Sequence, residues 1–121
     1  MKSGGALFTM TYYGSQMVVE NYNLMGPVKA ALEATTRYLA AELGPKGIRV
    51  HAISPGPLKT RAASGITAFD ELLQKAQSKA PARSLVSIDD VGAAVAFLGM
   101  DAAKLITGET LYVDGGYHII D

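Results

Sequence analysis

The sequence contains no cysteine, and this absence removes several kinds of chemistry at once. Disulfide bridges, zinc sites built from thiolates and a cysteine nucleophile are all excluded. Long apolar runs are missing too, because the run Val91–Met100 is about half the ~20 residues that a membrane-spanning helix needs. The apolar stretch Ala6–Met10 is interrupted too soon to be typical of a signal peptide. We therefore expect a cytoplasmic protein without a membrane partner.

The sequence also lacks an excess of charge of either sign. Lysine and arginine together number 11, as do aspartate and glutamate, so the formal net charge is zero. Proteins that bind nucleic acid or anionic membranes usually carry a basic surplus, which is not found here. The 121 residues are 49% hydrophobic and 18% charged, a composition typical of one globular domain. No nucleic-acid partner is expected.

Short runs of apolar, aromatic and β-branched residues, each bounded by turn residues, predict β-strands over residues 6–12, 48–53 and 110–113. The composition of the first run is typical of a buried strand. The pair Gly115–Gly116 predicts a turn, because no helix and no G-x-G-x-x-G frame surrounds it. His51 and His118 have no neighbouring acid or histidine at ligand spacing, so no metal site is expected.

Helical spacing fills the intervals between the predicted strands. The longest helix covers about residues 24–43, and we expect Gly44 to end it in the left-handed conformation. Val28, Leu32, Thr35 and Leu39 lie on one stripe of this helix. Capping boxes at Thr67–Asp70 and Ser87–Asp90 predict the starts of two further helices. Their predicted apolar faces are Phe69, Leu72, Leu73 and Ala76 in the first, and Ile88, Val91, Val95 and Leu98 in the second.

The element order β-α-β-α-α-β predicts an α/β fold. Strands separated by helices indicate right-handed crossovers and a parallel sheet covered on both faces. A sheet of this size is more usual as part of a larger one, so we expect the C-terminal portion of a doubly wound Rossmann fold with its first half absent.

Two tyrosines and a lysine are the strongest candidates for catalysis. Tyr12 ends the first predicted strand, at the edge where open parallel sheets bind ligands. Tyr22 precedes the long helix and Lys29 lies in its first or second turn, so the side chains can meet at one crevice. A phenol donates a proton with an unperturbed pKa of about 10, and a nearby ammonium stabilises negative charge. Spacing alone leaves open a second interpretation, in which the tyrosines are packing residues and the lysine is solvated.

The string NYNLMGPVKA, from Asn21 to Ala30, resembles the active-site segment of the NADH-dependent enoyl-[acyl-carrier-protein] reductases, a branch of the short-chain dehydrogenase/reductase family. Six residues separate Tyr22 from Lys29, which is the spacing of that branch. Further segments similar to the family are 12–14, 49–60, 62–66, 107–108 and 112–116. The resemblance therefore covers nearly the whole chain in family order.

The resemblance implies a role for each matching residue. Tyr22 is the implied active-site tyrosine, which hydrogen-bonds the thioester carbonyl of the substrate while hydride adds to its β-carbon. Lys29 is implied to hold the nicotinamide ribose of NADH, and Tyr12 to contact the substrate. The remaining implied cofactor-binding residues are Leu58, Lys59, Thr60, Arg61 and Ala62.

The implied reaction is the reduction of trans-2-enoyl-[acyl-carrier-protein] to acyl-[acyl-carrier-protein] in fatty acid biosynthesis, by a homotetramer in the full-length form. We expect the helix over 24–43 to form a subunit interface, because small residues occupy more than one of its faces. We expect residues 58–66 to close over cofactor and substrate. Family members often place basic residues after position 65 for acyl carrier protein. Here that helix begins with Thr67, Asp70 and Glu71, which leaves Lys59, Arg61 and Lys75 as candidate contacts.

The family's first half, with a glycine-rich turn that receives the pyrophosphate, has no counterpart in this sequence. We expect residues 1–121 to be the C-terminal half of a short-chain dehydrogenase/reductase Rossmann domain, inactive alone, whose first strand exposes Leu7, Phe8 and Met10 at a sheet edge. Two alternatives stay open. One is a different short-chain oxidoreductase, acting on a carbonyl or alcohol, which the spacing disfavours. The other is a non-catalytic remnant that folds with a partner, which the missing half favours.

Overall fold

A parallel three-stranded sheet forms the middle layer of the computed structural model, which describes residues 1–58, 60 and 69–121. The strands are β1 (Gly5–Met10), β2 (Ile48–Pro55) and β3 (Thr110–Val113), paired in the order β1-β2-β3. At the carboxyl end of the sheet, Met10 lies opposite Ile53 and Pro55 lies opposite Val113. This parallel pairing, with helices between the strands, confirms the predicted α/β class.

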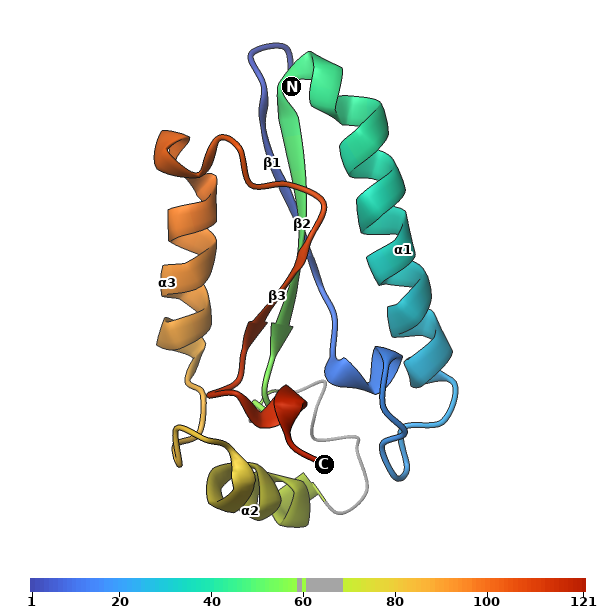
Figure 1. The fold of residues 1–121 in the computed structure, drawn as a ribbon, viewed down its shortest axis with the longest axis vertical. Coiled ribbons are helices and arrows are strands. Elements are labelled where there is room, and N and C mark those ends of the chain that lie inside the picture. Colours follow the sequence, from blue (N-terminus) through green and yellow to red (C-terminus); the bar gives the residue numbers. More distant parts are fainter. Residues whose placement is uncertain (59, 61–68) are drawn as a thin grey trace.

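Helices cover both faces of the sheet (Figure 1). The long helix α1 (Met25–Leu43) packs on one face and α3 (Ile88–Gly99) on the other, while α2 (Phe69–Lys79) lies beyond the carboxyl ends of the strands. Short 3-10 turns complete the described elements: η1 (Tyr13–Ser15), η2 (Gly44–Lys46), η4 (Asp101–Ala103) and η5 (Tyr117–Ile119). None of the described helices combines the length and the apolar character needed to cross a membrane.

Strand β1 occupies an edge of the sheet, so the expectation of a buried strand was wrong and that of an exposed edge is confirmed. Leu7, Phe8 and Met10 are 39%, 37% and 45% exposed. Strand β2 pairs on both sides, and its Ala52 and Ile53 are fully buried. An edge strand has only one neighbour to cover its side chains, which explains why similar apolar runs differ in burial.

Helix α1 turns a different stripe toward the sheet than the apolar pattern predicted. Val28 is 47% exposed and Thr35 is also exposed, whereas Glu33 and Thr36 are buried. Glu33 accepts a hydrogen bond from Thr11, just beyond β1, so its buried carboxylate is paired. An unpaired carboxylate in the interior would be costly, so the face that α1 buries depends on a partner that the apolar pattern does not record.

The end of α1 also differs from the prediction. Gly44 has a right-handed φ of −53°, and the chain continues into the 3-10 turn η2 before Gly47 adopts the left-handed conformation with φ 73°. Pro45 fits the first turn of η2, where its missing N–H is not needed. The left-handed glycine is therefore Gly47, after η2, and not Gly44 as predicted.

The start of α3 confirms the second predicted capping box. The Asp90 N–H donates to Ser87 Oγ (3.1 Å), and the Ser87 N–H donates to Asp90 Oδ2 (2.8 Å). Val91 and Leu98 are buried against Ile53 as part of an apolar cluster, but Ile88 is 69% exposed because it lies at the first position of the helix, outside this contact. The first capping box involves Thr67, which lies outside the described residues.

Candidate functional site

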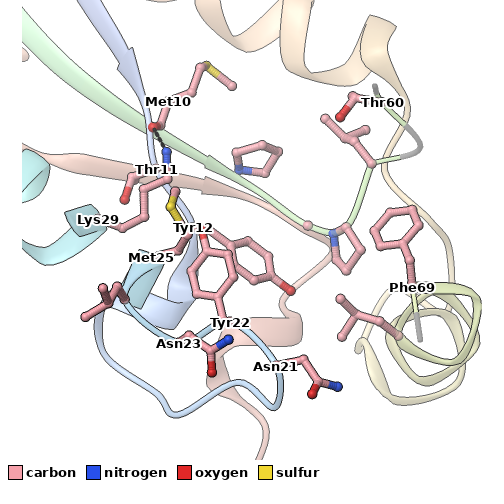
Figure 2. Close-up of a pocket in the computed structure, with 16 residues that line it drawn as sticks. Met10, Thr11, Tyr12, Asn21, Tyr22, Asn23, Met25, Lys29, Thr60 and Phe69 are labelled. Carbon is pink, nitrogen blue, oxygen red and sulfur yellow. Dashed lines mark hydrogen bonds between the residues drawn. The ribbon is translucent and has the colours of Figure 1, made fainter. Parts of the chain in front are cut away.

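A cavity of about 760 Å³ opens at the carboxyl ends of β1 and β2 (Figure 2). Parallel sheets bind ligands at this edge because the loops that leave the strands diverge there. The lining comes from segments far apart in the sequence: Met10, Thr11, Tyr12, Asn21, Tyr22, Asn23, Leu24, Met25, Lys29, Pro55, Gly56, Pro57, Leu58, Thr60, Phe69 and Leu72. The cavity thus brings together all three candidates for catalysis.

Tyr12 and Tyr22 place their rings side by side in the cavity (Figure 2). Their ring centroids are 5.3 Å apart, and the ring planes meet at 67° in an edge-to-face contact. Tyr12 follows β1 directly, where the Thr11 N–H still donates to the Ile53 carbonyl (2.8 Å) and extends the strand pairing. The sheet therefore fixes the direction in which Tyr12 enters the cavity.

Lys29 reaches the same edge from the second turn of α1. Its ammonium donates to the Met10 carbonyl oxygen at 3.1 Å (Figure 2). One turn further along the helix, the Thr11 hydroxyl donates to Glu33 Oε2 at 2.6 Å. These two bonds join α1 to the end of β1 at adjacent residues, so they fix the position of Lys29 relative to Tyr12. The Glu33 contact was not foreseen, because the apolar pattern drew attention to another face of the helix.

Burial keeps both cavity tyrosines protonated. It raises the pKa of Tyr12 far above the usual value, and the neighbouring phenol of Tyr13 adds to the effect. Burial also raises the pKa of Tyr22. Both phenols are therefore neutral hydrogen-bond donors at neutral pH. The Tyr12 hydroxyl is buried without a hydrogen-bond partner among the described residues, which is costly unless a ligand satisfies it.

The opposite wall of the cavity follows β2. It contains the chain from Pro55 to Leu58, then Thr60, whose N–H donates to the Leu58 carbonyl (2.9 Å). Phe69 and Leu72 of α2 close it with apolar side chains. Lys59, Arg61 and Ala62, which were predicted to bind a cofactor, lie outside the described residues, as does most of the 58–66 segment.

Aromatic residues of the C-terminal segment support Tyr12 from behind. The ring of Tyr13 meets Tyr12 edge-on, with centroids 5.0 Å apart, and it meets Tyr117 in the same way at 5.4 Å. Tyr117 is buried in η5, whose turn is fixed because the Asp114 carboxylate accepts two main-chain N–H bonds of 2.9 Å each. Sequence analysis missed this support, since nothing in the spacing links Tyr117 to Tyr13.

The structure gives both histidines an acidic partner, and the expectation that no acid lies near in sequence was wrong for His118 alone. His51 Nδ1 lies 2.6 Å from Glu109 Oε1, a contact between distant segments that spacing cannot reveal. His118 Nδ1 lies 2.9 Å from Asp114 Oδ2, and this spacing of four residues was visible in the sequence. Neither histidine lines the cavity.

A family model matches nearly the whole chain. Residues 1–118 match the family model described as "Enoyl-(Acyl carrier protein) reductase". The chain is 50% identical over 120 residues to enoyl-[acyl-carrier-protein] reductase [NADH] 1 of Rhizobium meliloti (strain 1021), covering 99% of this chain and 44% of that protein. It is 47% identical to the FabI enoyl-[acyl-carrier-protein] reductase [NADH] of Bacillus cereus, covering 99% of this chain and 47% of the relative.

Solved structures agree with the sequence relatives. The crystal structure of the Bacillus cereus enoyl-acyl carrier protein reductase with NADP+ and indole naphthyridinone superposes with a TM-score of 0.97 at 46% identity, over 100% of this chain and 47% of that one. The enzyme from Anaplasma phagocytophilum in complex with NAD gives a TM-score of 0.91 at 43% identity, over 100% and 44%. The chain therefore spans about half the length of the relatives it matches.

Proposed function

The chain belongs to the enoyl-[acyl-carrier-protein] reductase family, and on that premise we propose that it is the catalytic and substrate-loop portion of an NADH-dependent enoyl-[acyl-carrier-protein] reductase. In this proposal residues 1–121 are the C-terminal half of a Rossmann domain that reduces trans-2-enoyl thioesters carried by acyl carrier protein in fatty acid biosynthesis. The observation that carries it is the convergence of Tyr12, Tyr22 and Lys29 on one cavity at the carboxyl edge of a parallel sheet.

The described residues fit the nicotinamide end of NADH. Among the described residues the buried Tyr12 hydroxyl has no partner, and the Lys29 ammonium donates to the Met10 carbonyl, which leaves further donors for ribose hydroxyls. Leu58 and Thr60 line the facing wall. Lys59, Arg61 and Ala62 complete the proposed cofactor-binding set. When bound, NADH supplies the hydride.

Tyr22 acts on the substrate carbonyl in this proposal. Reduction at the β-carbon places negative charge on the thioester oxygen, and a neutral phenol aimed at that oxygen stabilises the charge by donating a hydrogen bond. Its raised pKa suits this role, because the proton stays on the phenol until the oxygen becomes a strong acceptor. Tyr12 borders the same space and orients the substrate, and the apolar side chains of Met25, Phe69 and Leu72 exclude water.

Three further statements belong to the proposal. The full-length form is a cytoplasmic homotetramer with α1 in a subunit interface, which the exposure of Val28 (47%) and Tyr38 (79%) on that helix supports. Acyl carrier protein docks near Lys75 and the basic positions 59 and 61. Residues 1–121 alone do not turn over, since they offer no glycine-rich turn for the pyrophosphate.

The test uses the joined protein, in which the amino-terminal half of the Bacillus cereus relative precedes residues 1–121. We expect it to consume NADH with a crotonyl thioester. Lys29→Ala should lower kcat/KM on the order of 100-fold, as expected when a reactant loses its positioning contact. Lys46→Ala is the matched control, because Lys46 is exposed in η2 at the other end of α1. An inactive joined protein, or equal rates for the two lysine variants, would contradict the proposal.

The 121-residue chain alone provides the second test. We expect no NADH binding at micromolar concentration, and association through the exposed edge of β1. Titration with NADH and sedimentation check both points. A monomer that binds NADH and reduces the thioester would show that this half holds a sufficient site.

A further inference from the structure

The backbone on both sides of Tyr22 adopts a conformation that ordinary residues avoid. Asn21 has φ 66° and Asn23 has φ 55°, so left-handed residues flank the tyrosine directly. Among the described residues, only Arg83 shares this conformation outside glycine. Asparagine tolerates it better than most residues, yet such geometry persists only where the surroundings hold it, and it gathers at functional sites.

Main-chain hydrogen bonds close the turns on both sides of Tyr22. The Tyr22 N–H donates to the Val19 carbonyl and the Met25 N–H donates to the Tyr22 carbonyl, each at 3.1 Å. The Gly26 N–H donates to the Asn23 carbonyl at 3.2 Å and leads into α1. Tyr22 therefore stands between two successive turns, and both turns require a left-handed residue beside it.

Gly14 holds the ring of Tyr22 from the other side. A Cβ atom at position 14 would lie 2.7 Å from Cδ2 and 2.8 Å from Cε2 of Tyr22, closer than atoms can approach. A Cβ at Gly26 would lie 3.0 Å from the Gly14 carbonyl oxygen. The ring is thus seated directly on the backbone of η1, and η1 in turn touches the first turn of α1.

We propose that Asn21, Asn23 and Gly14 form a clamp that holds the ring of Tyr22 in the cavity, and that they are positioning residues for the proposed reaction. The asparagines set the direction in which Tyr22 leaves the main chain, and Gly14 leaves a flat surface for its ring. The clamp acts through the left-handed backbone on both sides of Tyr22 and through the close approach of Gly14 to its ring. The catalytic consequence of this inference rests on the proposed function, whereas the clamp itself does not.

The experiment compares substitutions that separate backbone conformation from side-chain chemistry. Asn21→Ala and Asn23→Ala disfavour the left-handed conformation, whereas Asn21→Gly and Asn23→Gly permit it without the amide. Gly14→Ala removes the seat of the ring. Arg83→Ala is the matched control, because it disturbs a left-handed residue that does not line the cavity.

The readout is the phenol signal of Tyr22, followed by NMR of tyrosine labelled at Cζ with carbon-13 and assigned with Tyr22→Phe. Spectra are recorded on the 121-residue chain and on the joined protein. We expect the alanine variants and Gly14→Ala to move this signal and to bring the pKa of Tyr22 down toward its ordinary value. In the joined protein they should lower kcat about 10-fold or more, with little change in KM, as for a misplaced catalytic group. The glycine variants should restore the signal and most of kcat.

Two results would overturn the clamp. One is an unchanged Tyr22 signal in Gly14→Ala and in both alanine variants. The other is an equal change in Arg83→Ala, which would make the effect a general loss of stability. If the unsubstituted joined protein is inactive while the Tyr22 signal still responds as expected, the clamp stands and the proposed reaction fails.

Discussion

The two faces of the sheet are stabilised in different ways. On the α3 face, Val91, Leu98 and Ala103 surround Ile53 in an apolar cluster. On the α1 face, the buried residues include Glu33 and Thr36, and Glu33 is paired with Thr11. The α3 face also holds hydrogen bonds, because Arg49 donates to the carbonyls of Leu98 and Ala103, so both faces combine apolar burial with polar contacts. The α1 face differs in that its hydrogen bonds, from Lys29 and to Glu33, reach the end of β1 where the candidate site lies.

The largest effect should come from the apolar cluster on the α3 face. Leu98 is 2% exposed, so Leu98→Ala leaves a cavity beside Ile53 and should lower the free energy of unfolding by about 2–5 kcal/mol. Because Leu98 itself does not line the cavity, kcat of the remaining folded joined protein should stay within about 2-fold. Urea denaturation and an assay at low temperature check both parts. If Leu98→Ala lowered kcat as much as a substitution that displaces Tyr22, the two faces would not differ in their effect on the site.

A smaller loss of stability with a larger loss of function should follow on the α1 face. Thr11→Val keeps the side-chain shape but removes the donor to Glu33 Oε2, which should cost about 1–3 kcal/mol because a buried carboxylate loses its partner. Lys29 lies one turn away on α1, so KM for NADH should rise as well. Thr11→Ser retains the hydroxyl and is the matched control. An equal free energy of unfolding and an equal KM in the two variants would show that the Thr11 hydroxyl does not position α1.

A still smaller effect should come from the start of α3. Ser87→Ala removes one half of the capping box and should cost about 1 kcal/mol, with no change in the rate of the folded protein. Ser87→Asn keeps a capping side chain and should restore most of the loss. Thermal unfolding measures the difference, and a change in KM for NADH would show that α3 influences the site.

The tyrosines should not make the free energy of unfolding depend on pH near neutrality, but they should do so at alkaline pH. The pKa of Tyr12 is raised by burial, so the folded protein retains this proton above pH ~10, where the unfolded chain releases it. The unfolded state then binds fewer protons than the folded state, and the free energy of unfolding falls as the pH rises through ~10. Tyr12→Phe should flatten this fall. An identical pH dependence in Tyr12→Phe would assign the effect to other groups.

Features that depend on neighbouring residues could be predicted from the sequence, whereas contacts between distant residues could not. Strand and helix order followed from apolar periodicity, and the capping box of Ser87 and Asp90 followed from local chemistry. The orientation of α1 did not, because Glu33 is buried by a partner 22 residues away, which no local pattern records. The edge position of β1 followed from family strand order and not from its own apolar composition, which is typical of a buried strand.

The candidate residues themselves were found, but their supports were not. Tyr12, Tyr22 and Lys29 were recognised by spacing and resemblance, and they line one cavity. Asn21 and Asn23 were used only as part of the family-like string. Asparagine adopts the left-handed conformation more readily than most residues, so its presence on both sides of Tyr22 could have predicted this backbone. Gly14 gave no signal, since its role depends on the ring of a residue that folds back onto it.

The bond from Lys29 to Met10 has a consequence for how this site can diverge. Its acceptor is a main-chain carbonyl, so every amino acid at position 10 except one that distorts the strand offers the same oxygen. The Met10 side chain also lines the cavity. Natural variation can therefore change the shape of the cavity at position 10 while the lysine keeps its anchor. Position 11 has no such freedom, because Glu33 requires the hydroxyl of a threonine or serine there.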